Sequence, residues 1–306
     1  MDLVDTYLAV FPDKQEALLW DSEPVPFYMS PGRVVARDQK YVLKDAAKGV
    51  VGQFGAVVAD PSKQGVLNDR VHFGNGGTWQ TMNGTDVAYT VSPIAKLLLL
   101  GIVKFSMLDP AGMGVEMEAG KPGWNDAMNG LPGMIGSGMP ETFELLRLLR
   151  FCKKAVKAAK RSVKLHVELG DLLSSLLLAL GALGDDDGGS SSDAAFTYWD
   201  ASRTALETYR EATAIYFAGS EATWGHSELG AALELMIAKV ETGVTKALAM
   251  NNNTGIAPAY FAYPAASYEL TGEVETAETA RPFVTVTAFE EPVTMPNFLE
   301  VRRGEA

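Results

Sequence analysis

The stretch that decides the fold runs from Asp109 to Arg150 and reads DPAGMGVEMEAGKPGWNDAMNGLPGMIGSGMPETFELLRLLR. It begins as a long glycine-rich loop and ends as an apolar segment with helical spacing. Long loops without structure of their own are uncommon in compact domains and are usually functional or disordered. This one contains Trp124 and several methionines, which are not typical of a disordered segment. We therefore predict a shaped, functional loop on a rigid helical support.

Helical patterns dominate the chain on both sides of this loop. Ser92 and Pro93 suit the start of a helix, and Pro140 restarts one after the loop. An acidic, glycine-rich run at 184–193 is typical of a surface loop between two helices. The predicted helices cover about residues 92–108, 140–160, 164–183, 195–218 and 227–250.

The two ends of the chain have a different pattern. Residues 1–90 contain short apolar runs, such as Thr6–Phe11, punctuated by Pro, Gly and Asp, and we predict a β-rich, irregular segment there. Residues 257–306 return to β character, with strands expected at 259–263 and 283–289. The division is thus a β-rich lead-in at 1–90, a helical portion at 91–256 that carries the loop 109–140, and a β-containing C-terminal segment. The predicted fold class is mainly α with β-rich ends.

Composition limits the classes of function. The net charge of -12 excludes a nucleic-acid partner, because binding to a phosphate backbone needs clustered Lys and Arg. The single cysteine, Cys152, can form no internal disulfide, which favours a reducing compartment. The start, MDLVD, lacks the basic residues of a secretory signal, and the apolar run Leu172–Leu183 is too short to span a bilayer. We expect a cytoplasmic protein that does not enter a membrane.

The absence of several catalytic motifs narrows the range of possible functions further. The three histidines, His72, His166 and His226, have no metal-ligand spacing, so no metal site is predicted. There is no G-x-S-x-G elbow and no dinucleotide-binding G-x-G-x-x-G, so neither triad nor nicotinamide chemistry is expected, and no cofactor. Carboxylate chemistry remains. The acids of the loop region are Asp109, Glu116, Glu118, Asp126 and Glu141.

Asp126 differs from the other acids by its neighbours. It lies between Trp124-Asn125 and Asn129 in a loop rich in apolar residues. An indole offers a sugar ring a flat apolar surface, and amides can hydrogen-bond to its hydroxyls. A carboxyl partly withdrawn from water there has a raised pKa and can act as a general acid at neutral pH. The alternative is that Asp126 is an ordinary structural acid of the loop.

The run Gly123-Trp-Asn-Asp-Ala-Met-Asn129 resembles the W-N-D-G-M-N catalytic loop of cellobiose-phosphorylase-like glycoside phosphorylases. The resemblance is strong over about residues 85–150. It is patchy elsewhere, in F-P-D-K-Q-E-A-L-L and F-Y-M-S-P near the start and A-Y-F-A-Y-P near the end. It implies an (α/α)6 toroid, here a six-hairpin-type barrel fragment preceded by β structure. It also implies phosphorolysis of a β-linked glucose oligosaccharide with inversion, a glycosyltransferase-type reaction that uses inorganic phosphate as co-substrate.

Carried over by position, the resemblance makes Asp126 the acid that protonates the leaving oxygen. Trp124 and Asn125 then contact the sugar, with Asn129 beside them. Departures from the family pattern are Ala127 in place of glycine and the lead-in Glu118-Ala-Gly-Lys121-Pro-Gly. Glu118 and Lys121 have no role in that pattern. We take both as further substrate-binding candidates, and Glu118 also as a second carboxylate for a hydrolytic variant.

The resemblance covers only part of the family's barrel. The later helices and the phosphate-binding groups have no counterpart before Ala306, so the chain resembles the middle of a longer enzyme. The missing helices are expected from a longer chain or from another copy in a homo-oligomer. Alternatives that stay open are an inverting glycoside hydrolase that uses water, a catalytically incomplete sugar-binding or structural remnant, and a helical scaffold for protein partners. The glycosidic linkage stays open as well.

Overall fold

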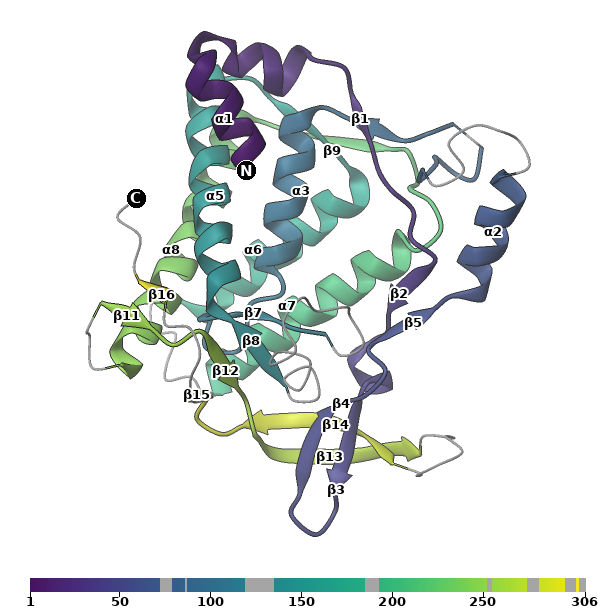
Figure 1. The fold of residues 1–306 in the computed structure, drawn as a ribbon, viewed down its shortest axis with the longest axis vertical. Helices are drawn as coiled ribbons and strands as arrows, with labels where there is room; N and C mark the ends of the chain where they lie inside the picture. Colours follow the sequence, from purple (N-terminus) through teal and green to yellow (C-terminus); the bar gives the residue numbers. More distant parts are fainter. Residues whose placement is uncertain are drawn as a thin grey trace.

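The computed structural model describes residues 1–71, 79–85, 87–118, 135–184, 193–251, 255–273, 281–294 and 301–302 (Figure 1). Its helices are α1 (Asp2–Val10), α2 (Pro61–Val71), α3 (Pro93–Phe105), α5 (Met139–Ala159), α6 (Val167–Leu183), α7 (Asp193–Ala212) and α8 (His226–Met250). Short helical turns cover Pro12–Lys14, Ala17–Asp21 and Arg37–Gln39.

The strands are short and all their pairings are antiparallel. One four-stranded sheet has the order β15-β12-β8-β7, with β7 at Val115–Glu116, β8 at Gly136–Gly138, β12 at Tyr260–Ala262 and β15 at Val293–Thr294. A second has the order β13-β14-β3-β4, with β3 at Tyr41–Asp45, β4 at Val50–Gln53, β13 at Ala265–Glu273 and β14 at Pro282–Phe289. Among the described residues, four two-stranded ladders complete the set: β1 (Val25–Pro26) with β6 (Thr90–Val91), β2 (Gly32–Val34) with β5 (Val57–Ala59), β9 (Val163–His166) with β10 (Glu221–Trp224), and β11 (Ile256–Ala257) with β16 (Val301–Arg302).

The central helices form where the sequence predicts them. α3 begins at Pro93, and α5 has Pro140 in its first turn, as expected for a residue whose missing N–H costs nothing there. α5 ends at Ala159, and its C-cap residue, Lys160, adopts a left-handed conformation with φ 52°. The apolar faces of α3, α5, α6 and α8 supply much of the buried core. α5 packs against α3 and α8, and α6 packs against α7.

The predicted fold class is wrong. The structure is 51% helical and 24% strand, a mixed α/β fold with several small antiparallel sheets, and a partial (α/α)6 toroid is not evident. The ladder between β9 and β10 is an example of the strands that were missed. It places β9 directly before α6 and β10 directly before α8. Such two- to four-residue strands are too short for a period-2 signal, and the helical pattern that follows Val163–His166 hid the strand there.

The lead-in segment also contains helices that the sequence did not predict. Thr6–Phe11 was expected as a strand but lies mostly in α1, where Leu3, Tyr7 and Val10 follow helical spacing. α2 starts at Pro61 after Asp60, whose Oδ1 accepts the backbone N–H groups of residues 62 and 63 at 2.9 and 3.1 Å. This is an N-cap.

The two ends of the chain meet in one structure. β14 pairs with β3, with Phe283 opposite Val42, so the C-terminal segment completes a sheet begun in the lead-in. Figure 1 shows this sheet below the helices, with β7 and β8 between the two. The buried apolar cluster includes Leu19 and Tyr41 from the lead-in and Phe261 and Phe289 from the C-terminal segment.

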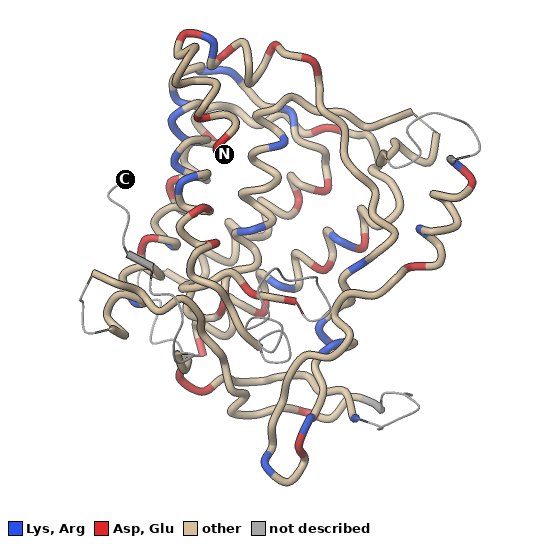
Figure 2. Tube along the Cα trace, viewed as in Figure 1, with Lys and Arg blue, Asp and Glu red and all other residues tan. Residues whose placement is uncertain are grey.

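Charged side chains lie mainly on the outside of the helices. Figure 2 shows Lys and Arg along α5, and two of them pair with carboxylates of α8: Arg150 with Glu241 at 2.7 Å, and Lys153 with Glu234. Exposed pairs of this kind contribute little stability. None of the helices within the described residues combines the length and the apolar character needed to cross a membrane.

Candidate functional site

The structure describes both ends of the predicted catalytic loop. β7 and β8 flank residues 119–134 and pair antiparallel, with Val115 opposite Gly138 and Glu116 opposite Ser137. One further bond, from the Met117 N–H to the Gly136 carbonyl at 2.9 Å, continues the ladder toward the loop. The two ends of the loop are therefore held side by side. The predicted site residues Lys121, Trp124, Asn125, Asp126 and Asn129 lie outside the described residues.

The returning end of the loop is part of a sheet. β8 pairs on its other side with β12, with Phe261 opposite Ser137. Next to this ladder, the Tyr263 N–H donates to the Ile135 carbonyl at 2.8 Å. A strand from the far C-terminal part of the chain thus fixes the point at which the loop rejoins the core.

Asp109, one of the acids of the loop region, is fully buried and holds β7 to β8. Its carboxylate accepts the backbone N–H groups of Met113 and Gly114 at 2.9 and 2.7 Å, and the Ser137 hydroxyl at 2.6 Å. Burial raises the pKa of Asp109, and these hydrogen bonds act in the opposite direction. With its acceptor oxygens occupied by protein donors, Asp109 serves the structure of the loop base.

Glu116 forms the first of two buried ion pairs at the leaving end of the loop. Its carboxylate pairs with the Arg203 guanidinium and also accepts the indole N–H of Trp199. Both partners belong to α7, and all three side chains are almost completely buried. A buried carboxylate needs such full pairing because removing it from water is costly.

Glu118 forms the second pair. Its Oε1 lies 2.7 Å from Nη1 of Arg210, again on α7, and 3.9 Å from Nζ of Lys40. Glu118 is 4% exposed. We call Lys40, Glu116, Glu118, Arg203 and Arg210 the loop-base charge cluster. It joins the last described residues before the loop to a rigid helix.

This position bears on the roles considered for Glu118. A general base that activates water must contact that water, whereas Glu118 is buried, pairs with Arg210 and lies 3.9 Å from Nζ of Lys40. Its surroundings are those of an anchor for the loop. The roles of Glu118 as a sugar ligand and as a second carboxylate remain predictions without support from its contacts.

The sequence indicated the two glutamates but not their partners. Arg203 and Arg210 are seven residues apart, two turns along one face of α7, so a shared binding partner was conceivable from spacing alone. Nothing in the sequence connects that face to Glu116 and Glu118, which lie more than 80 positions away. No feature of the sequence around Lys40 indicates that it lies near Glu118.

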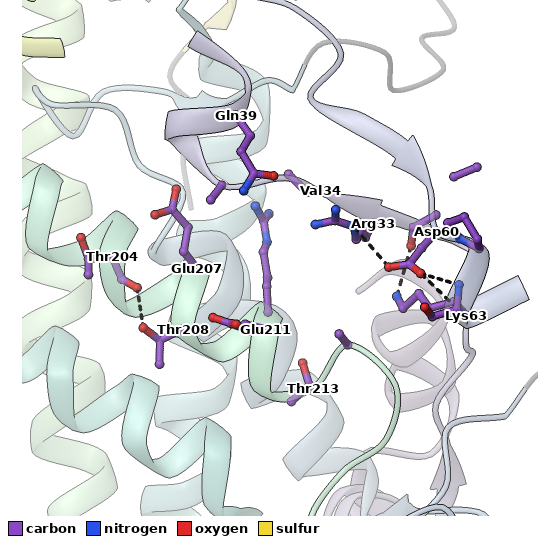
Figure 3. A pocket seen from close by; sticks show the side chains of 17 residues that line it. Arg33, Val34, Gln39, Asp60, Lys63, Thr204, Glu207, Thr208, Glu211 and Thr213 are labelled. Atoms are coloured by element: carbon purple, nitrogen blue, oxygen red, sulfur yellow. Dashed lines mark hydrogen bonds and ion pairs between the residues drawn. The ribbon is translucent and has the colours of Figure 1, made fainter. Parts of the chain in front are cut away.

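A polar pocket adjoins the loop-base charge cluster (Figure 3). It lies between α7 and the segment formed by β2, β5 and the start of α2, with a volume of about 790 Å³. Arg210 lines it and also pairs with Glu118, so the wall of the pocket continues into the base of the loop.

No protein-family model matches this chain, and no curated protein matches it. Function is therefore inferred from the residues of the loop and from the geometry around its base.

His166 lies buried in the core. His166 packs among Phe27, Tyr89 and Phe217, with its Nε2 3.1 Å from the Tyr209 hydroxyl. Burial lowers its pKa to about 4, so the ring is neutral at physiological pH. This is a packed core histidine. Among the described residues, no group of three or more His, Cys, Asp or Glu side chains has the arrangement of a metal site.

Lys40 gives a testable pH dependence. Burial, and next the nearby Arg203 charge, lowers its pKa to about 7 in the folded protein, against about 10.4 in an unfolded chain. Between these values the unfolded chain holds a proton that the folded protein lacks. The free energy of unfolding therefore rises with pH through this group, by at most about 1.4 kcal/mol per pH unit. Lys40→Met removes this dependence, so the stability of the wild type relative to the variant is expected to increase from about pH 7 to about pH 10.

Urea unfolding at several pH values in this window measures the difference. Lys48→Met, at an exposed lysine in the turn after β3, is the matched control. A difference between wild type and Lys40→Met that does not change with pH would show that Lys40 is not held in a desolvated site.

Proposed function

We propose that this chain is a carbohydrate-active enzyme of the inverting glycoside phosphorylase type. In this proposal Asp126 protonates the glycosidic oxygen while inorganic phosphate attacks the anomeric carbon of a β-linked glucose oligosaccharide. Trp124 and Asn125 contact the sugar beside the scissile bond, and Asn129 and Lys121 extend the contacts. The proposed compartment is the cytoplasm, and no cofactor beyond phosphate is required.

One observation carries the proposal beyond the sequence: the base of the Trp-Asn-Asp loop is held by buried, non-local interactions. β7 and β8 pair across it, and Glu116 and Glu118 tie its leaving end to α7. General acid catalysis requires a carboxyl group placed to within hydrogen-bond distance of one oxygen. A loop held firmly at both ends meets the first condition for such placement, and a solvated linker does not.

The position of Glu118 bears on whether phosphate or water attacks the sugar. An inverting hydrolase needs a second carboxylate that activates water on the opposite face of the sugar. Glu118, the candidate for that role, is buried between Arg210 and Lys40. We therefore favour phosphorolysis and keep the inverting hydrolase as the second candidate. The third candidate is a remnant that binds sugar without turning it over.

The test is release of glucose 1-phosphate from β-linked gluco-oligosaccharides in the presence of inorganic phosphate. Asp126→Asn is expected to lower the rate about 10²- to 10⁴-fold, because general acid catalysis contributes that much. Asp171→Asn, at an exposed acid on α6, is the matched control and should keep the wild-type rate.

Other outcomes of this assay would contradict the role of Asp126 or support one of the alternative functions. Equal rates for the wild type and Asp126→Asn would remove Asp126 from the mechanism. Free glucose formed at a rate independent of phosphate would identify a hydrolase. Oligosaccharide binding without any turnover would identify the remnant, and neither binding nor turnover would favour a protein scaffold.

A further inference from the structure

The pocket beside α7 has a polar lining whose charges balance. One wall is the face of α7, and the other comes from β2, β5 and the start of α2 (Figure 3). Its ionisable lining residues are Arg33, Asp60, Lys63, Glu207, Arg210 and Glu211. Three positive and three negative groups thus face one space of about 790 Å³, which is within the usual range for ligand pockets.

The three cations of the lining are already engaged. Arg33 Nε lies 3.2 Å from Oδ2 of Asp60, and Lys63 Nζ donates to the Gly32 carbonyl at 3.2 Å. Arg210 pairs with Glu118 at 2.7 Å. A phosphate or carboxylate ligand would have to compete with these partners, because strong anion sites offer cationic donors to the ligand itself. The positive charges of Arg33 and Arg210 are therefore already balanced by carboxylates before any ligand binds.

On the α7 wall, the Glu207 carboxylate and the Thr204 hydroxyl already accept hydrogen bonds from Arg37, at 3.0 and 2.7 Å. Acceptor oxygens of Glu211 and Thr208, in contrast, remain open. The Glu211 side chain is exposed and makes no ion pair with any of the described residues. The Thr208 hydroxyl donates to the Thr204 carbonyl at 3.0 Å, which leaves the lone pairs of its oxygen as acceptors. Figure 3 shows Thr204, Glu207, Thr208 and Glu211 together on this helix. The Glu211 carboxylate and the Thr208 hydroxyl oxygen, three residues apart on this helix, are matched by a ligand that carries several hydroxyl donors.

We propose that this pocket binds an uncharged, hydroxyl-rich ligand, and that this ligand is a gluco-oligosaccharide. The hydroxyl-rich class follows from the lining, whereas the choice of a saccharide rests on the proposed function. The bound chain contacts α7 through Glu211 and Thr208. Because Arg210 lines the same pocket and holds Glu118, the ligand reaches a residue that anchors the catalytic loop.

Calorimetric titration of the full chain tests this binding. The protein carries Asp126→Asn so that turnover does not consume the probe, and the probes are uncharged β-linked gluco-oligosaccharides and, separately, inorganic phosphate. Ala59→Trp fills the pocket from the exposed face of β5, and Glu211→Ala removes its open carboxylate. Each is expected to weaken oligosaccharide binding about tenfold or more.

The matched control is Ala201→Trp, at an exposed alanine that lies on α7 but outside this pocket. It should keep the wild-type affinity, and equal thermal midpoints of the two tryptophan variants establish that both fold. Equal weakening by Ala59→Trp and Ala201→Trp would overturn the proposal. Absence of oligosaccharide binding, or competition by phosphate for the same site, would overturn it as well.

The two proposals fail in different ways. Oligosaccharide binding that Ala59→Trp abolishes, in a wild-type protein that releases no glucose 1-phosphate, supports the pocket and removes the phosphorylase. Phosphorolysis with oligosaccharide binding unchanged in Ala59→Trp and Glu211→Ala removes the pocket and leaves the phosphorylase.

Discussion

Arg203→Met is expected to lower the free energy of unfolding by about 3–5 kcal/mol, the usual cost of leaving a buried charge without its partner. Glu116 is 2% exposed, and its carboxylate depends on the Arg203 guanidinium and the Trp199 indole N–H. The substitution removes the only charged partner that the structure gives to this carboxylate within the described residues. Urea unfolding at neutral pH measures the loss.

Two comparisons isolate the cause. Arg150→Met breaks a pair with Glu241 whose side chains are 44% and 48% exposed, and it should cost no more than about 1 kcal/mol. The double variant Arg203→Met with Glu116→Leu removes both charges and should recover much of the stability, because an apolar replacement of a buried pair is often neutral or better. A single-variant loss no larger than that of Arg150→Met would contradict the buried pair.

Gly243→Ala is expected to destabilise the protein by about 3 kcal/mol, at the upper end of the usual range for overpacking. A Cβ at this position of α8 would stand 1.7 Å from the carbonyl oxygen of Gly112 and 2.4 Å from its carbonyl carbon. The obstacle is backbone, so no side-chain rotation relieves it. Gly112 is itself constrained, with φ +73° and its N–H bonded to the Asp109 carbonyl at 2.9 Å.

Gly230→Ala is the matched control on the same helix. A Cβ there meets nothing within 4 Å, so alanine should stabilise α8 by about 0.5–1 kcal/mol through its better helix propensity. Thermal or urea unfolding of the two variants should therefore give opposite signs. A Gly243→Ala variant as stable as the wild type would show that α8 does not approach Gly112 this closely.

These two sites explain why the base of the loop escaped prediction. The loop itself is conspicuous in the sequence, through its glycines and its Trp-Asn-Asp triplet. Its support comes from Arg203, from Gly243 and from the β12 strand, all distant along the chain. No feature of the local sequence distinguishes Arg203, Gly243 or the residues of β12 from their neighbours. Only the folded chain shows which of them face the loop.

The predictions that were wrong have the same physical origin. The period-3.6 pattern correctly located α3, α5 and α8, because helix formation depends on neighbours three and four positions apart. A strand forms only against a partner, and ladders such as β9 with β10 join residues 55 or more positions apart. The fold class followed the local signal and overstated the helices, and the small sheets that make this a mixed α/β fold were missed.

The sequence by itself determined where α3, α5 and α8 lie, and it marked the loop at 109–140 as the candidate site to which the proposed chemistry is assigned. Caps, prolines and apolar periodicity are local properties, so a linear reading suffices for them. The tertiary structure alone decided that β7 and β8 close the base of that loop, that two buried ion pairs tie it to α7, and that a polar pocket adjoins Arg210. Buried charges are stable only when they are paired, and their partners are fixed by how distant segments pack.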